Sequence, residues 1–105
     1  MNERLQISNG LNAETWFQDE CMSIAMVTLN GVNDRIVNSI SDMTYEIIAG
    51  AGKFTVGDCC VVTVQVGDKI SIPAGTQYHD EGKLMMLASA TPPFNNDDVE
   101  VLTTH

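Results

Sequence analysis

The sequence predicts an all-β protein made of one domain, and three observations point to it. Apolar residues recur with a period close to two in most segments, which is the spacing of a half-buried strand. The segments are short and end at glycine, asparagine, aspartate or proline, with turns roughly every 8 to 12 residues. The chain has 105 residues, enough for one hydrophobic core but not for two. About seven to nine such strands are typical of a sandwich or a barrel.

Each expected strand is a short alternating run that stops at a turn signal. The expected strands are Cys21–Leu29, Arg35–Ile40, Met43–Ile48, Lys53–Val56, Cys60–Val66, Lys69–Ile72 and Lys83–Ala90. Turns are expected at Asn30-Gly31, at Ala49–Gly52, at Gly57-Asp58 as a hairpin, at Gly67-Asp68, at Pro73–Gly75 and at Pro92-Pro93. Leu11–Phe17, capped by Asn12, is the one expected helix. A core over about 20–93 would then carry an N-terminal cap, 1–19, and a C-terminal arm, 94–105, that forms at most one edge strand or reaches a neighbour.

Composition narrows the class of partner. Apolar residues make up 44% of the chain and charged residues 18%, the balance of a packed globular protein. Fourteen acidic and five basic residues give a net charge of -9, which repels nucleic acid and anionic membranes. The N-terminal residues lack a basic and apolar leader, so a cytoplasmic protein is expected. Three cysteines without C-x-x-C spacing predict reduced, mostly buried thiols and disfavour zinc.

Glycine and proline spacing adds a more specific signal. The run Gly67-Asp68-Lys69-Ile70-Ser71-Ile72-Pro73-Ala74-Gly75 resembles the second sequence motif of cupins. Gly31 and Gly50 have the separation of the two glycines that bound the shorter form of the first cupin motif. The resemblance extends over about Gly31 to Pro93, most of the chain. It implies a small single cupin domain, a jelly-roll or double-stranded β-helix barrel.

The resemblance also implies where a metal would be held, and the residues there cannot reproduce the usual metal site of cupins. The two histidines of the first motif fall on Val37 and Ser39, its glutamate on Met43, and the histidine of the second motif on Tyr78. Valine has no donor atom and methionine only a soft thioether, so we expect no metal and no cofactor. His79 is one residue past the motif position, which on a regular strand turns it to the outside. A β-bulge over 75–77 would turn His79 inward, with Asp42, Glu46 or Asp80 as helpers, but would still supply a single histidine.

Alternation along the same strands predicts what faces the barrel interior. The expected lining residues are Val37, Ser39, Met43, Tyr45, Ile47 and Tyr78. An apolar wall with two phenols and a hydroxyl is typical of a site for a small ligand. The alternative is that these side chains fill the barrel completely, as happens when the strand number is low.

Two functions of different classes follow. The first is a binding module that holds a small, weakly polar metabolite such as a carbohydrate. The second is a metal-independent isomerase, lyase or cyclase in which Tyr78, Tyr45 and His79 are the candidates for proton transfer. His79 and Asp80 are adjacent on a strand and cannot form a dyad, which argues against epimerisation. A metal enzyme with a rearranged site is a third hypothesis.

A homodimer is the expected assembly. Trp16 and Phe17 would either plug one end of the barrel or cover a partner subunit. The resemblance to cupins implies a second means of association, through exposed sheet edges.

Overall fold

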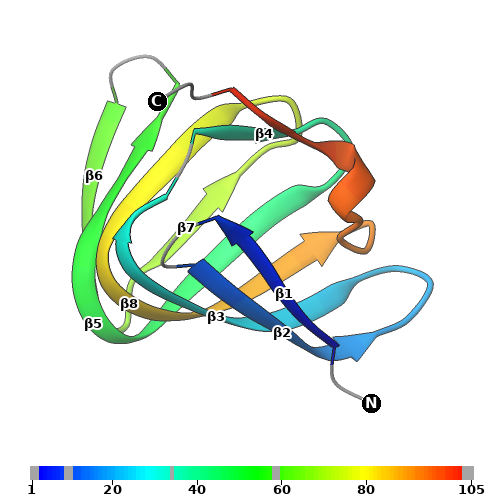
Figure 1. Ribbon diagram of the computed structural model, residues 1–105, viewed down its shortest axis with the longest axis horizontal. Helices are drawn as coiled ribbons and strands as arrows, with labels where there is room; N and C mark the ends of the chain where they lie inside the picture. The colour runs from blue at the N-terminus through cyan, green and yellow to red at the C-terminus, as the bar shows by residue number, and fades with distance from the viewer. Residues whose placement is uncertain (1–2, 9–10, 34, 58–59, 103–105) are drawn as a thin grey trace.

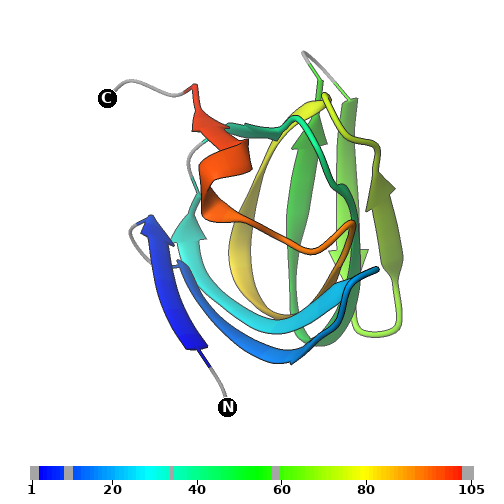
Figure 2. The same ribbon diagram turned by 90° about the vertical axis from the view of Figure 1, so that its right-hand side faces the viewer.

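The chain is a single curled antiparallel sheet. The computed structural model describes residues 3–8, 11–33, 35–57 and 60–102, with side chains from residue 13 onward except that of residue 96. The described elements are β1 (Glu3–Ser8), β2 (Leu11–Gln18), β3 (Ser23–Val32), β4 (Ile36–Asn38), β5 (Asp42–Val56), β6 (Cys60–Gln65), β7 (Lys69–Ile72), β8 (Gln77–Thr91), the 3₁₀ turn η1 (Asn96–Asp98) and β9 (Val99–Val101). Figure 1 and Figure 2 show the sheet curling into a half-barrel. The all-β prediction is confirmed. No helix in the described part of the chain is long and apolar enough to cross a membrane.

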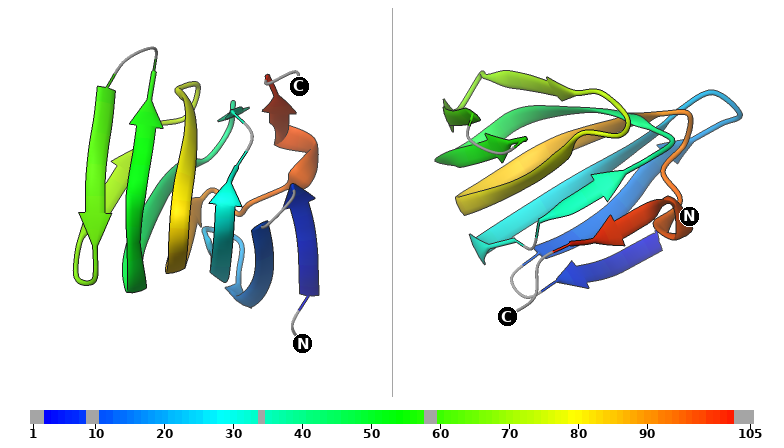
Figure 3. Two further views of the ribbon diagram at one scale, coloured as in Figure 1. Left: turned by 60° about the vertical axis from the view of Figure 1, so that its left-hand side comes forward. Right: turned by 90° about the horizontal axis from the view of Figure 1, so that it is seen from above.

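Two long strands form the middle of the sheet. β5 and β8 each have 15 residues and pair with one another along their length, from Asp42↔Thr91 to Val56↔Tyr78. The other edge of β8 pairs with β3 and then β4, and the other edge of β5 pairs with β7 and then β6. β2 and β1 continue the sheet from β3, and β9 continues it from β4. Figure 3 shows β6, β5, β8, β3, β2 and β1 side by side in this order.

The run Ala49–Gly52 is not the turn that the sequence predicts. β5 continues through it, with a register shift between Ile47 and Ala49. A Cβ atom on Gly50 would lie 1.9 Å from the carbonyl oxygen of Lys83, and one on Gly52 would lie 2.1 Å from that of Glu81. The glycines are therefore there because the backbones of β5 and β8 approach closely at the bend, not because the chain reverses.

The helix expected at Leu11–Phe17 is also wrong. This segment is strand β2, which pairs with β3 on one side and β1 on the other. Thr15, Trp16 and Phe17 are β-branched or aromatic and favour a strand, and the pairing satisfies backbone groups on both edges. The segment 1–19 thus contributes two strands to the sheet. The side chain of Asn12, the expected cap, is outside the described part.

Three further expectations can be compared with the structure. The hairpin around Gly57 is present, since β5 and β6 pair up to Val56↔Cys60, although residues 58–59 are not described. The C-terminal segment supplies β9 as an edge strand on β4, and residues 103–105 are not described. Cys21 and Cys60 are free thiols, but both are exposed, so the predicted burial is wrong for these two. Cys59 lies outside the described residues.

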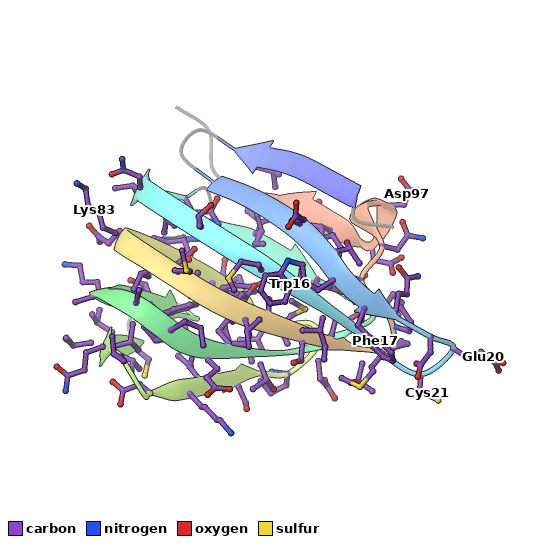
Figure 4. The ribbon with its side chains drawn as sticks, turned by 90° about the horizontal axis from the view of Figure 1, so that it is seen from below. Trp16, Phe17, Glu20, Cys21, Lys83 and Asp97 are labelled. Carbon is purple, nitrogen blue, oxygen red and sulfur yellow. The ribbon has the colours of Figure 1, made fainter. Side chains whose placement is uncertain are left out.

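Trp16 and Phe17 lie on the outside of the barrel. Their side chains are 52% and 48% exposed, and Figure 4 shows both on the outer side of β2. Neither plugs an end of the barrel, because both project away from the interior. That they cover a second subunit stays a prediction.

The core fills only part of the interior. The largest fully buried apolar side chains are those of Phe54, Ile47, Ile72, Met86 and Val64. The ring of Phe54 contacts those of Tyr45 and Tyr78 at centroid separations of 5.2 and 6.4 Å. The two tyrosines belong to this core and also line the pocket described below. They form the boundary between the filled part and the hollow part.

The bend in β5 gives a stability prediction. Gly52→Ala should lower the free energy of unfolding by more than about 3 kcal/mol, because its Cβ would meet the backbone of β8. Gly67→Ala is the matched control: φ is +95° there and the space is open, so only backbone strain of about 1–2 kcal/mol is expected. Urea denaturation of both variants measures the difference. Equal losses would show that close approach is not the reason for Gly52.

Candidate functional site

A pocket lies inside the half-barrel where β2, β3, β5 and β8 surround it. Its cavity volume is about 60 Å³. Most lining residues are small or apolar, and the polar ones are two phenols, one carboxylate, two amides and two hydroxyls. The described lining residues are Ala13, Thr15, Gln18, Ser23, Ala25, Val27, Asn33, Ile36, Met43, Tyr45, Tyr78, Asp80, Ala88, Ala90 and Phe94. This composition is typical of a site for a small, largely uncharged molecule.

Small side chains at inward positions explain why this part of the interior is hollow. Ala25 on β3 pairs with Ala88 on β8, and Ala88 pairs with Tyr45 on β5. In the neighbouring row Ser23 pairs with Ala90. Side chains this short cannot reach across the barrel, so space remains beside Tyr45. Ile47 and Met86 form the next inward-facing pair toward the core, and their larger side chains fill the space between the strands there.

Asp80 is the one acidic side chain among the described lining residues. It is 2% exposed, and its Oδ1 accepts a hydrogen bond of 3.0 Å from the side-chain amide of Asn33. Burial away from water raises the pKa of Asp80 above its ordinary 3.8. The bonds from Asn33 and from its own backbone, together with the charge of nearby His79, oppose that rise. The carboxyl group is therefore poised to take up a proton more readily than an exposed aspartate.

The two phenols form a direct pair at the wall of the pocket. The hydroxyl oxygens of Tyr45 and Tyr78 are 2.5 Å apart, and either can be the donor. Burial raises the pKa of both tyrosines above the ordinary 10.0, and the negative charge of Asp80 raises them further. Both phenols are therefore protonated at neutral pH and act as hydrogen-bond donors, not as bases.

The structure brings together only part of the residues expected from the sequence. Met43, Tyr45 and Tyr78 line the pocket. Val37 and Ser39 do not, so that expectation is wrong by one residue: on β4 the buried positions are Ile36 and Asn38. Ser39 is exposed, and its hydroxyl donates to the carbonyl oxygen of Asp98.

Two other candidates fall outside the lining. Ile47 is buried at 1% exposure but packs within the core. His79 lies between Tyr78 and Asp80, which both face inward, and pairs with Thr55 in an uninterrupted register. Alternation therefore turns His79 to the outer face, and no bulge rotates it inward.

Sequence reasoning did not place Asp80 or Asn33 on the pocket wall, and it named Asp80 only as a helper for an inward-turned His79. Asp80 is two residues after Tyr78, so the alternation that places Tyr78 inward places Asp80 inward as well. Asn33 follows β3 in a segment without a periodic signal, so only the fold reveals that it lies against β8. The small residues Ala25, Ala88 and Ala90, at inward positions of β3 and β8, were a second signal in the sequence that could have predicted a pocket.

The donor set does not fit the metal that cupin motifs usually hold. No imidazole lines the pocket in the described residues, and the motif positions carry Val37, Ser39, Met43 and Tyr78. Within the described residues there is also no group of three or more His, Cys, Asp or Glu side chains arranged to hold an ion. The one carboxylate, from Asp80, is a poor site for a divalent ion by itself.

Comparison with known proteins identifies the fold. No family model and no curated protein matches the chain. Among solved structures, a variant of PAC13 from Streptomyces with uridine has a TM-score of 0.87 and 24% identity, over 97% of this chain and 85% of PAC13. PAC13 is described as a nucleoside dehydratase. KdgF from Halomonas has a TM-score of 0.77 and 14% identity, over 90% of this chain and 89% of KdgF.

A third structure agrees. A Klebsiella pneumoniae protein with a double-stranded β-helix domain has a TM-score of 0.77 and 14% identity, over 95% of this chain and 91% of that one. Identities this low establish the fold alone. Together with the described sheet they show that this chain has a small cupin-type fold.

Proposed function

We propose that the pocket binds a small, uncharged molecule that bears hydroxyl groups, and that the chain removes water from it as a metal-independent lyase. One observation carries the proposal: a buried carboxylate and a pair of protonated phenols line the same apolar pocket. Such a set contains one proton acceptor and two proton donors. The likeness to PAC13, described as a nucleoside dehydratase, supports this reaction class and makes a nucleoside the first ligand to test.

The chemistry can be written with the groups present. The Asp80 carboxylate takes a proton from a carbon next to a carbonyl group, because only such a C–H is acidic enough for a carboxylate base. The electrons of that bond form a C=C bond, and the C–O bond to the hydroxyl on the next carbon breaks. A phenol of the Tyr45–Tyr78 pair gives its proton to the departing hydroxide, which leaves as water. The proton on Asp80 then returns to the phenol through solvent.

The tyrosines suit the donor role better than the base role. A raised pKa keeps the phenol proton in place until a strong base develops beside it, and departing hydroxide is a stronger base than phenolate. The hydrogen bond between the two phenols lets one support the other as charge develops.

The charge of the pocket selects for neutral ligands. No Lys, Arg or His is among the described lining residues, and Asp80 adds negative charge. The whole chain has a net charge of -9. A phosphate group in this site would meet like charge without a partner.

A binding module without catalysis, for a carbohydrate for example, is the second candidate. The mostly apolar lining with scattered hydroxyl and amide groups favours it, since these groups orient a sugar without reacting. The two candidates differ in what Asp80 does.

The first test separates them. A panel of β-hydroxy aldehydes and ketones, including nucleosides oxidised to an aldehyde or ketone on the sugar, is incubated with the protein and scored by mass spectrometry for loss of one water. Asp80→Asn and Tyr78→Phe should each lower the rate by about 100-fold or more while uridine affinity changes by less than about tenfold. Glu81→Gln, which alters a partly exposed carboxylate ion-paired with Lys53, is the matched control. Ligand binding with no water loss across the panel would favour the binding module.

The second test concerns ligand charge. Uridine should bind at least about tenfold more tightly than uridine 5′-monophosphate, because the phosphate brings like charge to a pocket without cations. The difference should shrink in Asp80→Asn. Isothermal titration calorimetry at fixed ionic strength measures both affinities. Equal or tighter binding of the monophosphate would contradict the selection for neutral ligands.

The third test uses stability. Because burial raises the pKa of Asp80, the folded state binds its proton more tightly than the unfolded state does. The contribution of Asp80 to the free energy of unfolding therefore falls as the pH rises from 3.8, the ordinary pKa, through the raised pKa of the folded state. Above the raised pKa this contribution no longer changes with pH. Asp80→Asn removes this loss, so the variant should be the more stable at neutral pH, with the difference vanishing below pH 3.8. Urea denaturation over a pH series measures this, and parallel curves would refute the buried-carboxylate argument.

A further inference from the structure

Asn33 is attached to Asp80 at two points. It lies just after β3, is 5% exposed and lines the pocket. Its backbone N–H donates to the carbonyl oxygen of Asp80 at 2.9 Å, and its side-chain amide donates to Oδ1 of Asp80 at 3.0 Å. The backbone bond extends the β3–β8 ladder by one residue beyond Val32↔Glu81. The amide is therefore held by the sheet itself and not by a freely moving loop.

A buried carboxylate needs a donor to fix its orientation. The plane of a carboxyl group turns easily about the Cβ–Cγ bond unless a hydrogen bond holds one oxygen. Among the described side chains, Asn33 is the one that donates to the Asp80 carboxylate. The bond engages Oδ1 and thereby determines which way Oδ2 points.

The chemical nature of the donor matters as well. A lysine or arginine at this position would neutralise the carboxylate and weaken it as a base. An amide stabilises the charged form by a charge-assisted bond but adds no charge of its own. The other groups facing or flanking Asp80 are Tyr45 from β5 with Tyr78 and His79 from β8, and of these only His79 favours the charged carboxylate.

We propose that Asn33 is a positioning residue, whose side-chain amide holds the Asp80 carboxylate in the orientation in which it meets the ligand. The inference rests on the proposed function, because it assigns Asn33 to the proton acceptor of that reaction. Asn33 acts through Asp80 and does not itself exchange a proton.

The test follows the ionisation of Asp80 by NMR, which requires no ligand. The carboxyl carbon of Asp80, assigned with Asp80→Asn, is titrated in the wild type and in Asn33→Leu, which has a similar size but no donor. The midpoint should move to higher pH in Asn33→Leu, because the bond that favours the charged form is lost. In the reaction assay, kcat should fall about tenfold or more with a smaller change in KM.

Asn38→Leu is the matched control. Asn38 is also a buried asparagine, at 3% exposure, but its side chain accepts from the backbone of Ile40 and Ser41 and does not line the pocket. Its replacement should destabilise the fold without moving the Asp80 midpoint. A midpoint that moves equally in both variants would show a general effect of destabilisation and overturn the proposal.

A measurement on the wild type keeps the test decisive if Asn33→Leu does not fold. The side-chain amide protons of Asn33 should titrate with the same midpoint as the Asp80 carboxyl carbon, and independent behaviour would overturn the proposal. Failure of the proposed function is distinguishable: coupled titration with no water loss across the substrate panel would refute the lyase but leave the bond between Asn33 and Asp80 intact.

Discussion

The close pairing of β5 with β8 is the constraint on which the rest of the structure depends. The two strands remain hydrogen-bonded through a bend, where Gly50 and Gly52 leave room for the backbone of β8. The bend curls the sheet, and curling turns its inward face into an enclosed interior. Tyr45 and Tyr78 come from opposite ends of the β5–β8 ladder, and their hydroxyl groups meet only because the sheet is curled. A flat sheet of the same strands would have no site.

A buried carboxylate is costly for the fold, and its neighbours reduce that cost only in part. Asp80 receives a bond from Asn33 and none from a lysine or arginine in the described chain. An ion pair would stabilise the charge more strongly but would reduce its ability to accept a proton. Under the proposed function, this arrangement gives up stability for reactivity, a trade-off that is common at catalytic sites.

Much of the fold could be predicted from the sequence, but less of the site. Period-two alternation and the glycine and proline spacing indicated the strands and the cupin-type barrel. These patterns mislead where one residue type serves two structural roles. The glycines within residues 49–52 predicted a turn, but in the structure they allow β5 and β8 to approach closely. Alternation placed Tyr45 and Tyr78 correctly, whereas Val37 and Ser39 were misplaced because β4 is only three residues long and its phase could not be fixed. The contact of Asn33 with Asp80 joins residues 47 positions apart, and no local pattern encodes it.

The pocket owes its space to short side chains at Ala25, Ala88 and Ala90 and not to an opening of the backbone. Its shape can therefore be altered one methyl group at a time while the hydrogen-bonded ladder stays as it is. Lineages that share this barrel could acquire different ligand preferences through exchanges at these few positions. Tyr45, Tyr78 and Asp80 occupy other positions of β5 and β8 and would stay where they are.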